Sequence, residues 1–549
     1  MECQKKYTIP AMLRNSFAEY STKQSLVFAG DENRTYSQLE KEINAVVDQL
    51  IALSIVKDDK VAILSANMPN WGIAYFAIAT IGAIAVPILP DFSITEISNI
   101  IIHSESKVIF VSDNLFNKIE QFTSDSSKII IRIETIGKIS NSDLTNNRNN
   151  HEYYQSVTVE EDDVASIIYT SGTTGKSKGV MLTHKNIVWD AEHGGMIQKI
   201  TVSDRFLSLL PLSHTYENTL GLILPVMFGA SVHYLKKIAT PAVLLPALQA
   251  VKPTTILSVP LIIEKIYKKQ IEPKFNKNVL IRSLYKFQPI RLLLNRIAGK
   301  KLMKTFGGRI HFFGIGGAKL DGKVEKFLRE AKFPYSIGYG LTETAPLLAG
   351  AGPKITRFQT IGPAMPGAEL KINQPDQKTG HGEVWAKGPN VMKGYFKEPE
   401  LTKEVITEDG WFKTGDLGLF DKKGYLAFKG RLKNIIVSAS GENIFPEEIE
   451  SVINNFRNVV ESLVIERKGK LVALVLLNME EMEAKYQSLR EQAELYNKKL
   501  DDMLEELLDE LQLYVNSHVN KFSQVQVVLL QQVPFERTPT QKIKRFLYS

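Results

Sequence analysis

Apolar residues along the chain form short continuous runs, typical of buried strands, and stretches spaced by three or four, which predict amphipathic helices. A helix is predicted to begin near Thr35, because Ser37 stands three residues before Glu40 as in a capping box, and to run through Leu53. The expected strands cover residues 60–64, 107–111, 164–168, 205–210, 254–259, 309–313, 424–430, 435–437, 463–465, 471–477 and 525–530. The mixture of helices and strands indicates an α/β fold.

Residues 71–90, WGIAYFAIATIGAIAVPILP, carry no charge and approach the length of a membrane-spanning helix. Gly82 and Pro87 interrupt this segment, and its second half is strand-like. We therefore expect a buried helix that runs into a buried strand, as α/β proteins often show, rather than a transmembrane span.

The length of 549 residues exceeds what one hydrophobic core supports, so two or more domains are expected. We place the boundary at the polar break after Gly430, giving a large domain of mixed sheets and helices at 1–430 and a small α+β domain at 431–549. The small domain contains a charged helical region, 479–520, whose apolar stripe is expected to pack against that domain. The stripe consists of Met482, Tyr486, Leu489, Ala493, Tyr496, Leu500, Met503, Leu507 and Leu511.

A content of 44% hydrophobic and 23% charged residues is that of an ordinary soluble globular protein. The single cysteine, Cys3, excludes an internal disulfide framework and fits a reducing compartment. The first twenty residues show no secretory signal, so a cytoplasmic location is expected. The sequence does not indicate an oligomeric state.

Residues 264–304 are strongly basic, with twelve Lys and Arg against two Glu and a net charge of +10. Apolar residues are interleaved with these charges, which suits an amphipathic element on the anionic inner face of a membrane. A solvated helical face explains the charge equally well, and both interpretations stay open here. Nucleic acid is a weaker candidate, because no nucleic-acid-binding motif accompanies the segment.

The strongest candidate for chemistry is YTSGTTGKSKG at residues 169–179, where an apolar run breaks into glycine and hydroxyl residues. Such a loop can cradle phosphates through backbone N–H groups, hydroxyls and a lysine, although a mobile surface loop of turn residues fits the composition as well. It is not a Walker loop, because Thr170 stands where the first glycine of GxxxxGK[ST] is required.

Several other strand ends carry polar or glycine-rich residues. The GxG at Gly314–Gly316 lacks the third glycine of the dinucleotide pattern, since residue 319 is Lys. The run YSIGYGLTET at 335–344 ends with the carboxylate of Glu343, and GWFKTGDLG at 410–418 offers Asp416 in a tight turn suited to a ribose diol. His214, in PLSHTYE, could orient substrate, although a lone histidine is more often structural.

In this order the motifs resemble those of the adenylate-forming enzymes, the superfamily of acyl-CoA synthetases, peptide-synthetase adenylation domains and beetle luciferases. The resemblance spans nearly the whole chain, from YTSGTTGKSKGVMLTHKN through GIGGA, YGLTET and GWFKTGDLG to KGRLKNIIVSASGENIFPEEIE and TPTQKIKR. It implies that the β- and γ-phosphates of ATP contact Thr170, Ser171, Gly172, Thr173, Thr174, Gly175 and Lys178. It implies an adenine site at Gly316, Gly317, Ala318, Tyr339 and Gly340.

The same resemblance implies roles for single residues. Thr342 would contact the α-phosphate, Glu343 would hold Mg²⁺, and the ribose would lie against Asp416 and Arg431. Lys433 would be the hinge about which the small domain rotates, Gly441 would border the pantetheine channel of coenzyme A, and Lys542 would be the catalytic lysine. His214, within a motif of the long-chain subgroup, is grouped with the catalytic candidates.

The implied reaction is ATP-dependent activation of a fatty acid to an acyl-adenylate, followed by transfer to the thiol of coenzyme A. Three features resemble the long-chain acyl-CoA synthetase subgroup: no glycine before Lys542, the PLSHTYE motif, and the insertions at 264–304 and 479–520. Ser177 and Asn434 depart from the family pattern without removing a chemical role. The alternatives are an acyl-AMP ligase that loads an acyl-carrier protein and an inert scaffold, which is disfavoured because Glu343 and Lys542 are both present.

Overall fold

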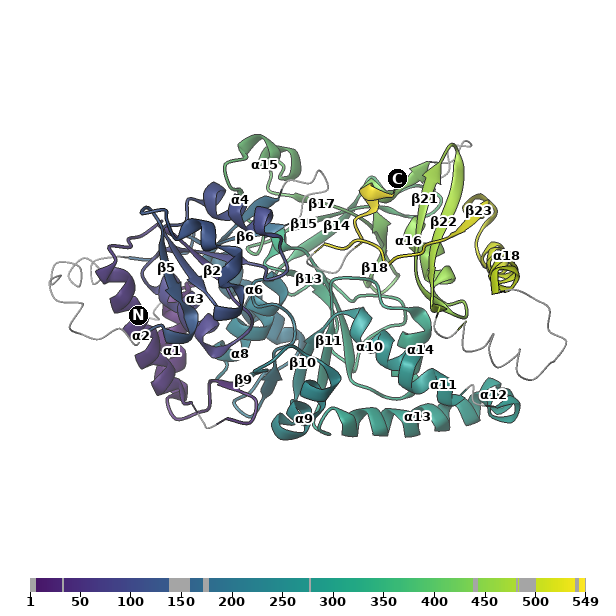
Figure 1. Cartoon of the computed structure of the whole chain (residues 1–549), viewed down its shortest axis with the longest axis horizontal. Helices are drawn as coiled ribbons and strands as arrows, with labels where there is room; N and C mark the ends of the chain where they lie inside the picture. Colours follow the sequence, from purple (N-terminus) through teal and green to yellow (C-terminus); the bar gives the residue numbers. More distant parts are fainter. Residues whose placement is uncertain are drawn as a thin grey trace. The chain divides into compact units, whose positions relative to one another are not determined.

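The computed structural model describes residues 6–31, 34–137, 158–170, 177–275, 278–437, 443–479, 482, 500–538 and 543–548. The predicted α/β class is confirmed, with strands and helices alternating through most of the chain (Figure 1). The chain divides into two compact units. The larger comprises Met1–Lys371, Trp385–Thr414 and Phe420–Ala427, and the smaller comprises Ile372–Val384, Gly415–Leu419 and Phe428–Ser549.

The division between the units runs through the strands of a four-stranded sheet, in the order β14-β15-β17-β18. These strands are β14 (Glu369–Asn373), β15 (Gly382–Lys387), β17 (Phe412–Phe420) and β18 (Leu426–Arg431). The single boundary placed after residue 430, and the mobility of the small domain, stay predictions.

A seven-stranded sheet in the larger unit has the order β16-β7-β6-β3-β2-β4-β5. Its strands are β16 (Gly394–Tyr395), β7 (Lys178–Thr183), β6 (Val164–Thr170), β3 (Ile84–Ile88), β2 (Lys60–Leu64), β4 (Val108–Val111) and β5 (Ile129–Arg132). The pairs β6 with β3, β3 with β2, β2 with β4 and β4 with β5 are parallel. In contrast, β7 runs antiparallel to both β6 and β16. As a result, β7 joins β6 and β16, which are more than 220 residues apart in the sequence.

A second seven-stranded sheet has the order β1-β9-β8-β10-β11-β12-β13. Its strands are β1 (Leu26–Phe28), β9 (Ser231–Tyr234), β8 (Arg205–Leu207), β10 (Thr255–Ser258), β11 (Phe312–Ile315), β12 (Tyr335–Gly340) and β13 (Leu347–Gly350). Every neighbouring pair is parallel except β12 with β13. The carboxyl ends of β8, β10, β11 and β12 therefore meet at one edge, where open α/β sheets bind ligands. The strands predicted at 205–210 and 309–313 are corrected in extent, since β8 ends at Leu207 and β11 begins at Phe312.

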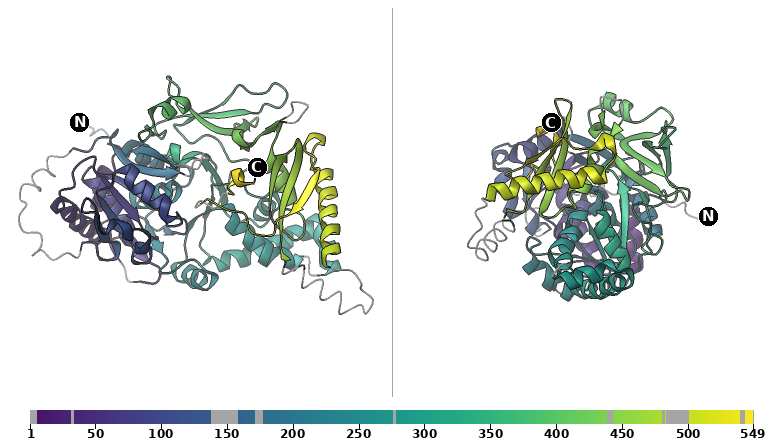
Figure 2. Two further views of the ribbon diagram at one scale, coloured as in Figure 1. Left: turned by 45° about the horizontal axis from the view of Figure 1, so that its top comes forward. Right: turned by 90° about the vertical axis from the view of Figure 1, so that its right-hand side faces the viewer.

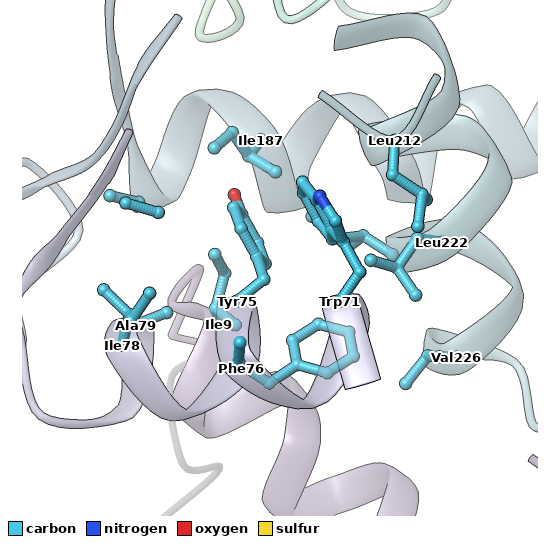
Figure 3. Close-up of a cluster of buried hydrophobic side chains, with 14 of the residues drawn as sticks. Ile9, Trp71, Tyr75, Phe76, Ile78, Ala79, Ile187, Leu212, Leu222 and Val226 are labelled. Atoms are coloured by element: carbon cyan, nitrogen blue, oxygen red, sulfur yellow. The ribbon is translucent and has the colours of Figure 1, made fainter. Parts of the chain in front are cut away.

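Helices α1 (Ile9–Tyr20), α3 (Pro69–Thr80), α6 (His184–Ile197) and α8 (Leu224–Met227) pack against one another, and α3 and α6 each contact strands of both sheets. Figure 3 shows their shared core, in which Trp71 and Tyr75 stack with ring centroids 5.4 Å apart. Around this pair lie Ile187, Leu212 and Leu222. The hydrophobic contacts of α3 therefore involve both sheets, which explains why it is buried along its whole length.

The segment 71–90 forms most of α3, a turn at Gly82 with φ of +72°, and the buried strand β3. The expectation of a buried helix followed by a buried strand is thus confirmed. Within the described ranges, no helix has the length and apolar content needed to cross a membrane.

Helix α2 (Tyr36–Ala52) begins where the sequence predicted, but its capping box uses other residues. Thr35 is the N-cap, its side chain accepts from Gln38 N, and Gln38 Oε1 accepts from Thr35 N at 2.8 Å. The proposed pair Ser37 and Glu40 is wrong, because the helix starts two residues earlier than that pair requires. Further helices described in the larger unit include α4 (Ile94–Ser104), α7 (Thr215–Glu217), α9 (Pro241–Val251), α14 (Gly322–Glu330) and α15 (Pro399–Val405).

The basic segment forms a series of helices rather than one amphipathic element. These are α10 (Pro260–Ile266), a π-helical turn (Tyr267–Ile271), α11 (Glu272–Phe275), α12 (Val279–Lys286) and α13 (Gln288–Thr305). Arg291 of α13 is fixed to Glu330 of α14 by hydrogen bonds of 3.0 and 3.1 Å, and Asn295 donates to the same carboxylate at 2.7 Å. In contrast, α12 buries none of its residues.

The smaller unit contains an antiparallel pair, β19 (Ile436–Val437) with β20 (Asn443–Ile444), and the sheet β21-β22-β23. The sheet consists of β21 (Val459–Arg467), β22 (Lys470–Leu477) and β23 (Val527–Leu530). Helices α16 (Pro446–Ile453) and α18 (Leu500–His518) share its core, and Figure 2 shows α18 lying along the sheet. Met482, Leu507 and Leu511 of the predicted stripe are buried there, which confirms that these residues pack within the small domain. The stripe residues Tyr486 to Tyr496 lie outside the described part of the chain.

Candidate active site

The hairpin of β6 and β7 fixes both ends of the candidate phosphate loop. The ladder between the two strands ends with Thr170 paired to Lys178. The predicted strand therefore leads directly into the glycine- and hydroxyl-rich segment, as the apolar run indicated. Ser171, Gly172, Thr173, Thr174 and Gly175 lie outside the described residues, so their phosphate contacts stay predictions.

Glu343 lies in a short 3-10 helix, Thr342–Thr344, directly after β12. Its Oε1 accepts a hydrogen bond of 2.9 Å from the hydroxyl of Tyr395, which is 6% exposed. The ring of Tyr395 also faces the ammonium of Lys178, whose Nζ is 5.2 Å from the ring centroid. Burial and the neighbouring Glu343 carboxylate raise the pKa of Tyr395, so the phenol stays protonated and acts as a donor.

Tyr395 was missed by the sequence analysis. It reaches the cluster because β16 pairs with β7, with Tyr395 opposite Val180. No local pattern in the sequence predicts that the two-residue strand β16 pairs with β7, which lies more than 200 residues earlier.

The backbone around Glu343 is tightly fixed. A Cβ atom on Gly340 would lie 1.7 Å from the carbonyl oxygen of Pro346, so only glycine fits at the end of β12. The same oxygen accepts from Leu341 N at 3.1 Å and from Thr344 Oγ1 at 2.7 Å. These contacts hold the turn that presents Thr342 and Glu343.

A buried polar network holds the turn that carries Thr342 and Glu343. Asn390 Nδ2 donates to the carbonyl oxygens of Thr344 and Leu347 at 3.0 and 2.8 Å, and Leu347 N donates to Asp190 at 3.1 Å. Asp190 is fully buried, and this burial raises the pKa of its carboxyl well above the ordinary value.

The predicted adenine residues come from two adjacent strands. Parallel β11 and β12 pair with Ile315 opposite Ile337, so the segment Gly316–Ala318 follows one strand beside Tyr339 and Gly340 on the other. Gly317 has φ of +86°, a conformation that favours glycine, and it is exposed. The structure thus brings the five predicted adenine residues to one edge of the sheet.

An apolar cavity of about 50 Å³ lies next to this edge. Its walls include Tyr216 and four glycines, Gly194, Gly314, Gly338 and Gly350, whose missing side chains create space. The other lining residues are mainly Ile197, Ile200, Phe206, Leu220, Leu224, Leu257, Phe312, Ile337 and Leu347. The polar residues Gln198, Thr255 and Ser336 complete the lining, so the walls suit a largely apolar group of a ligand.

His214 has a visible structural role. It is the N-cap of α7, and its Nδ1 accepts from Tyr216 N at 3.2 Å. Three residues after His214, Glu217 is buried, which raises the pKa of its carboxyl to about 8. The catalytic role of His214 stays a prediction.

Within the smaller unit, the two predicted ribose residues form an ion pair. Arg431 Nε is 3.0 Å from Asp416 Oδ1, and the Asp416 side chain is 2% exposed while that of Arg431 is 44% exposed. Lys433 lies in the following 3-10 helix, Leu432–Asn434. Gly441 and Lys542 are outside the described residues, so their roles stay predictions.

The residues present fit a magnesium ion bound together with a nucleotide. Where the chain is described, no three His, Cys, Asp or Glu side chains gather into a metal cluster. Mg²⁺ commonly binds one or two carboxylates and completes its shell with phosphates and water. The single carboxylate of Glu343, next to the glycine-rich strand ends, suits this mode.

The AMP-binding enzyme family matches residues 13–396, and the chain belongs to this family. A chloroplastic long-chain-fatty-acid–[acyl-carrier-protein] ligase of Arabidopsis thaliana is 30% identical, with 86% of this chain and 76% of that protein aligned. A long-chain-fatty-acid–CoA ligase of Mycobacterium bovis is 28% identical over 96% of this chain and 92% of that protein. The resemblance to the long-chain subgroup is thereby confirmed.

Solved structures support the fold independently. O-succinylbenzoate coenzyme A synthetase from Bacillus subtilis, in complex with ATP and magnesium, matches with a TM-score of 0.76 at 23% identity. The match covers 97% of this chain and 98% of that chain.

Proposed function

We propose that this protein activates a long-chain fatty acid with ATP, releasing pyrophosphate, and transfers the acyl group from the acyl-adenylate to the thiol of coenzyme A. The observation that carries the proposal is the cluster of Glu343, Tyr395 and Lys178. It lies beside two glycine-rich strand ends and an apolar cavity. These are the parts that an enzyme needs to hold a polyphosphate, a nucleoside and an apolar acid together.

The reaction joins two anions, so positive charge and hydrogen-bond donors must offset their repulsion. The carboxylate of the fatty acid attacks the α-phosphorus, a P–O bond forms, and pyrophosphate leaves. Lys178 would pair with the leaving phosphates and Thr342 would donate to the α-phosphate. Magnesium, held by Glu343, would supply further positive charge at the phosphates. The thiol then attacks the acyl carbon of the adenylate, and AMP leaves.

The role of Lys542 follows from the same charge argument. Its ammonium would bridge the carboxylate, the ribose and the α-phosphate during adenylate formation, while Asp416 and Arg431 would hold the ribose. In the second step the small domain would rotate about Lys433, withdraw Lys542 and open a channel for pantetheine beside Gly441.

The apolar cavity suggests where the acyl chain begins. A long chain exceeds about 50 Å³, so its binding would require the cavity to widen. The test is acid-dependent ATP–pyrophosphate exchange over acids from acetate to C18, together with aryl acids. Exchange that peaks with long chains supports the proposal. A peak with short or aromatic acids would contradict the long-chain substrate.

The acceptor is tested separately, because the relatives include both CoA ligases and an acyl-carrier-protein ligase. Purified protein, loaded with acyl-adenylate, is offered coenzyme A or a carrier protein bearing phosphopantetheine. Faster thioester formation with coenzyme A is expected. Transfer to the carrier protein alone would favour the alternative, an acyl-AMP ligase.

We propose further that the basic segment 264–304 contacts an anionic membrane, which would place the protein at the cytoplasmic face. Apolar side chains of α12 and the start of α13 are exposed: Val279 by 72%, Leu280 by 68%, Phe287 by 62% and Leu293 by 59%. Arg282 and Lys286 lie on the same short helix. Exposed apolar groups between cations suit the interface of anionic lipids.

The membrane contact is tested by sedimentation with vesicles. Leu280→Asp with Phe287→Asp should weaken binding to phosphatidylglycerol vesicles at any salt concentration. Arg282→Gln with Lys286→Gln should weaken binding most at low salt, because surface charges are screened at high salt. Lys403→Gln on the exposed helix α15 is the control. Unchanged sedimentation of both double variants would show that the segment is a solvated face.

A further inference from the structure

Tyr395 contacts two residues that are distant from it and from each other in the sequence. Its hydroxyl donates to Glu343 Oε1 at 2.9 Å, and its ring lies 5.2 Å from Lys178 Nζ. The two partners come from different sheets, Glu343 from the edge after β12 and Lys178 from the start of β7. One buried side chain therefore links the candidate metal ligand to the candidate phosphate-binding lysine.

The backbone of Tyr395 is fixed on both sides. Its N–H donates to Thr402 Oγ1 at 2.9 Å, and the next residue, Phe396, donates from its N–H to Gly179 O at 2.7 Å. Gly394 has φ of +147°, and a Cβ there would lie 2.7 Å from Thr402 Cγ2, so glycine permits this close approach. The ring thus has little freedom to move relative to β7.

The segment that carries Tyr395 also holds the backbone of Glu343. Met392 N donates to Glu343 O at 2.8 Å. The carboxylate is therefore constrained at both ends, by a backbone contact at residue 392 and by a side-chain contact at residue 395. The hydrogen bond from the phenol therefore fixes the direction in which the Glu343 carboxylate faces.

We infer that Tyr395 is a positioning residue for metal–nucleotide binding: it orients the Glu343 carboxylate through its hydroxyl and supports the Lys178 ammonium through its ring. The inference rests on the proposed function only in assigning the metal to Glu343 and the phosphates to Lys178. Hydrogen bonds to metal-ligating carboxylates orient the ligand, and their loss commonly lowers metal affinity about 10- to 100-fold. A buried tyrosine that only fills space would have no such effect.

Two variants separate the contacts. Tyr395→Phe removes the hydroxyl and keeps the ring, whereas Tyr395→Leu removes both. The matched control is Tyr335→Phe, because the Tyr335 hydroxyl donates to a buried carboxylate, Glu325 Oε1, at the same distance of 2.9 Å but at the opposite end of β12 from Glu343. Melting temperatures establish that each variant is folded.

Binding is measured without acid substrate, so that no turnover occurs. Mn²⁺ binding in the presence of ATP is followed by electron paramagnetic resonance, and ATP binding without metal by calorimetry. Tyr395→Phe should weaken Mn²⁺ binding about tenfold or more and leave metal-free ATP binding unchanged. Tyr395→Leu should in addition weaken metal-free ATP binding about two- to fivefold, through loss of the cation–π contact. Tyr335→Phe should change neither affinity.

Wild-type Mn²⁺ affinity in folded Tyr395→Phe would overturn the inference, as would an equal loss in Tyr335→Phe. Failure of the proposed function gives a different result, namely no acid-dependent pyrophosphate exchange by the wild type. The metal-binding series still reports on Tyr395 in that case, because it does not depend on the acid.

Discussion

Gly340 provides the sharpest test of the site, because its neighbours are backbone atoms that cannot rotate away. In Gly340→Ala the new Cβ would be 1.7 Å from Pro346 O, 2.7 Å from Pro346 C and 3.1 Å from Leu347 Cα. Carbon and oxygen approach without bonding to about 3.3 Å, so the carbonyl must move by about 1.6 Å. The turn bearing Glu343 must move with it.

This displacement has a calculable cost. It breaks the hydrogen bonds that Pro346 O accepts from Leu341 N and Thr344 Oγ1, each contributing about 1 kcal/mol net. Overpacking adds about 1–3 kcal/mol. We expect a loss of about 3–5 kcal/mol in the free energy of unfolding, together with weakened ATP binding. The loss is a large part of the roughly 5–15 kcal/mol that stabilises a typical domain.

The assay is urea unfolding followed by tryptophan fluorescence. The four tryptophans, at positions 71, 189, 385 and 411, all belong to the larger unit, and Trp71 and Trp189 lie in its hydrophobic core, so the signal follows the unfolding of that core. Gly338→Ala is the control, because a Cβ there would only touch Leu347 Cδ1 at 3.4 Å. A stable Gly340→Ala protein that binds ATP like the wild type would refute the reasoning.

Three other substitutions test separate parts of the protein. Lys542→Ala should abolish adenylate formation and spare thioester formation from supplied acyl-adenylate; equal loss of both half-reactions would contradict its assignment. Gly338→Val should narrow the apolar cavity and shift pyrophosphate exchange towards shorter acids, and an unchanged acid profile would place the acyl chain elsewhere. Burial lowers the pKa of His184 to about 4 from the ordinary 6.5, so the unfolded state takes up the proton first as pH falls. The free energy of unfolding should therefore decrease from about pH 6.5 towards pH 4, less steeply in His184→Asn, and equal slopes would refute this cause.

Predictions from local pattern succeeded where the pattern is determined by burial. The strand at residues 60–64 has the predicted bounds, and the uncharged segment 71–90 divides at Gly82 into helix and strand. The capping box was found in the right place with the wrong residues, because Thr35 and Gln38 match the pattern as well as Ser37 and Glu40. The types of the side chains alone do not determine which of two nearby residues is the N-cap of a helix.

Predictions failed, or were never made, where distant segments meet. The position of Tyr395 depends on the pairing of β16 with β7, and the closeness of Gly316 to Gly340 on the parallel pairing of β11 with β12. The order of the motifs, through the family resemblance, was enough to place Gly316 near Gly340. No motif predicts the position of Tyr395, because that position depends on the register between two sheet strands and not on residues that neighbour Tyr395 in the sequence.

The position of β1 has a consequence for synthesis of the chain. β1 pairs with β9, and the Tyr36 hydroxyl donates to Ala230 O, so the N-terminal segment is completed by residues made about 200 positions later. At about 5–20 residues per second, the ribosome needs about 10–40 s to supply them. During that interval Trp71 lacks the cover of Leu212 and Leu222. The first two hundred residues should therefore depend on chaperones while nascent and fail to fold when expressed alone.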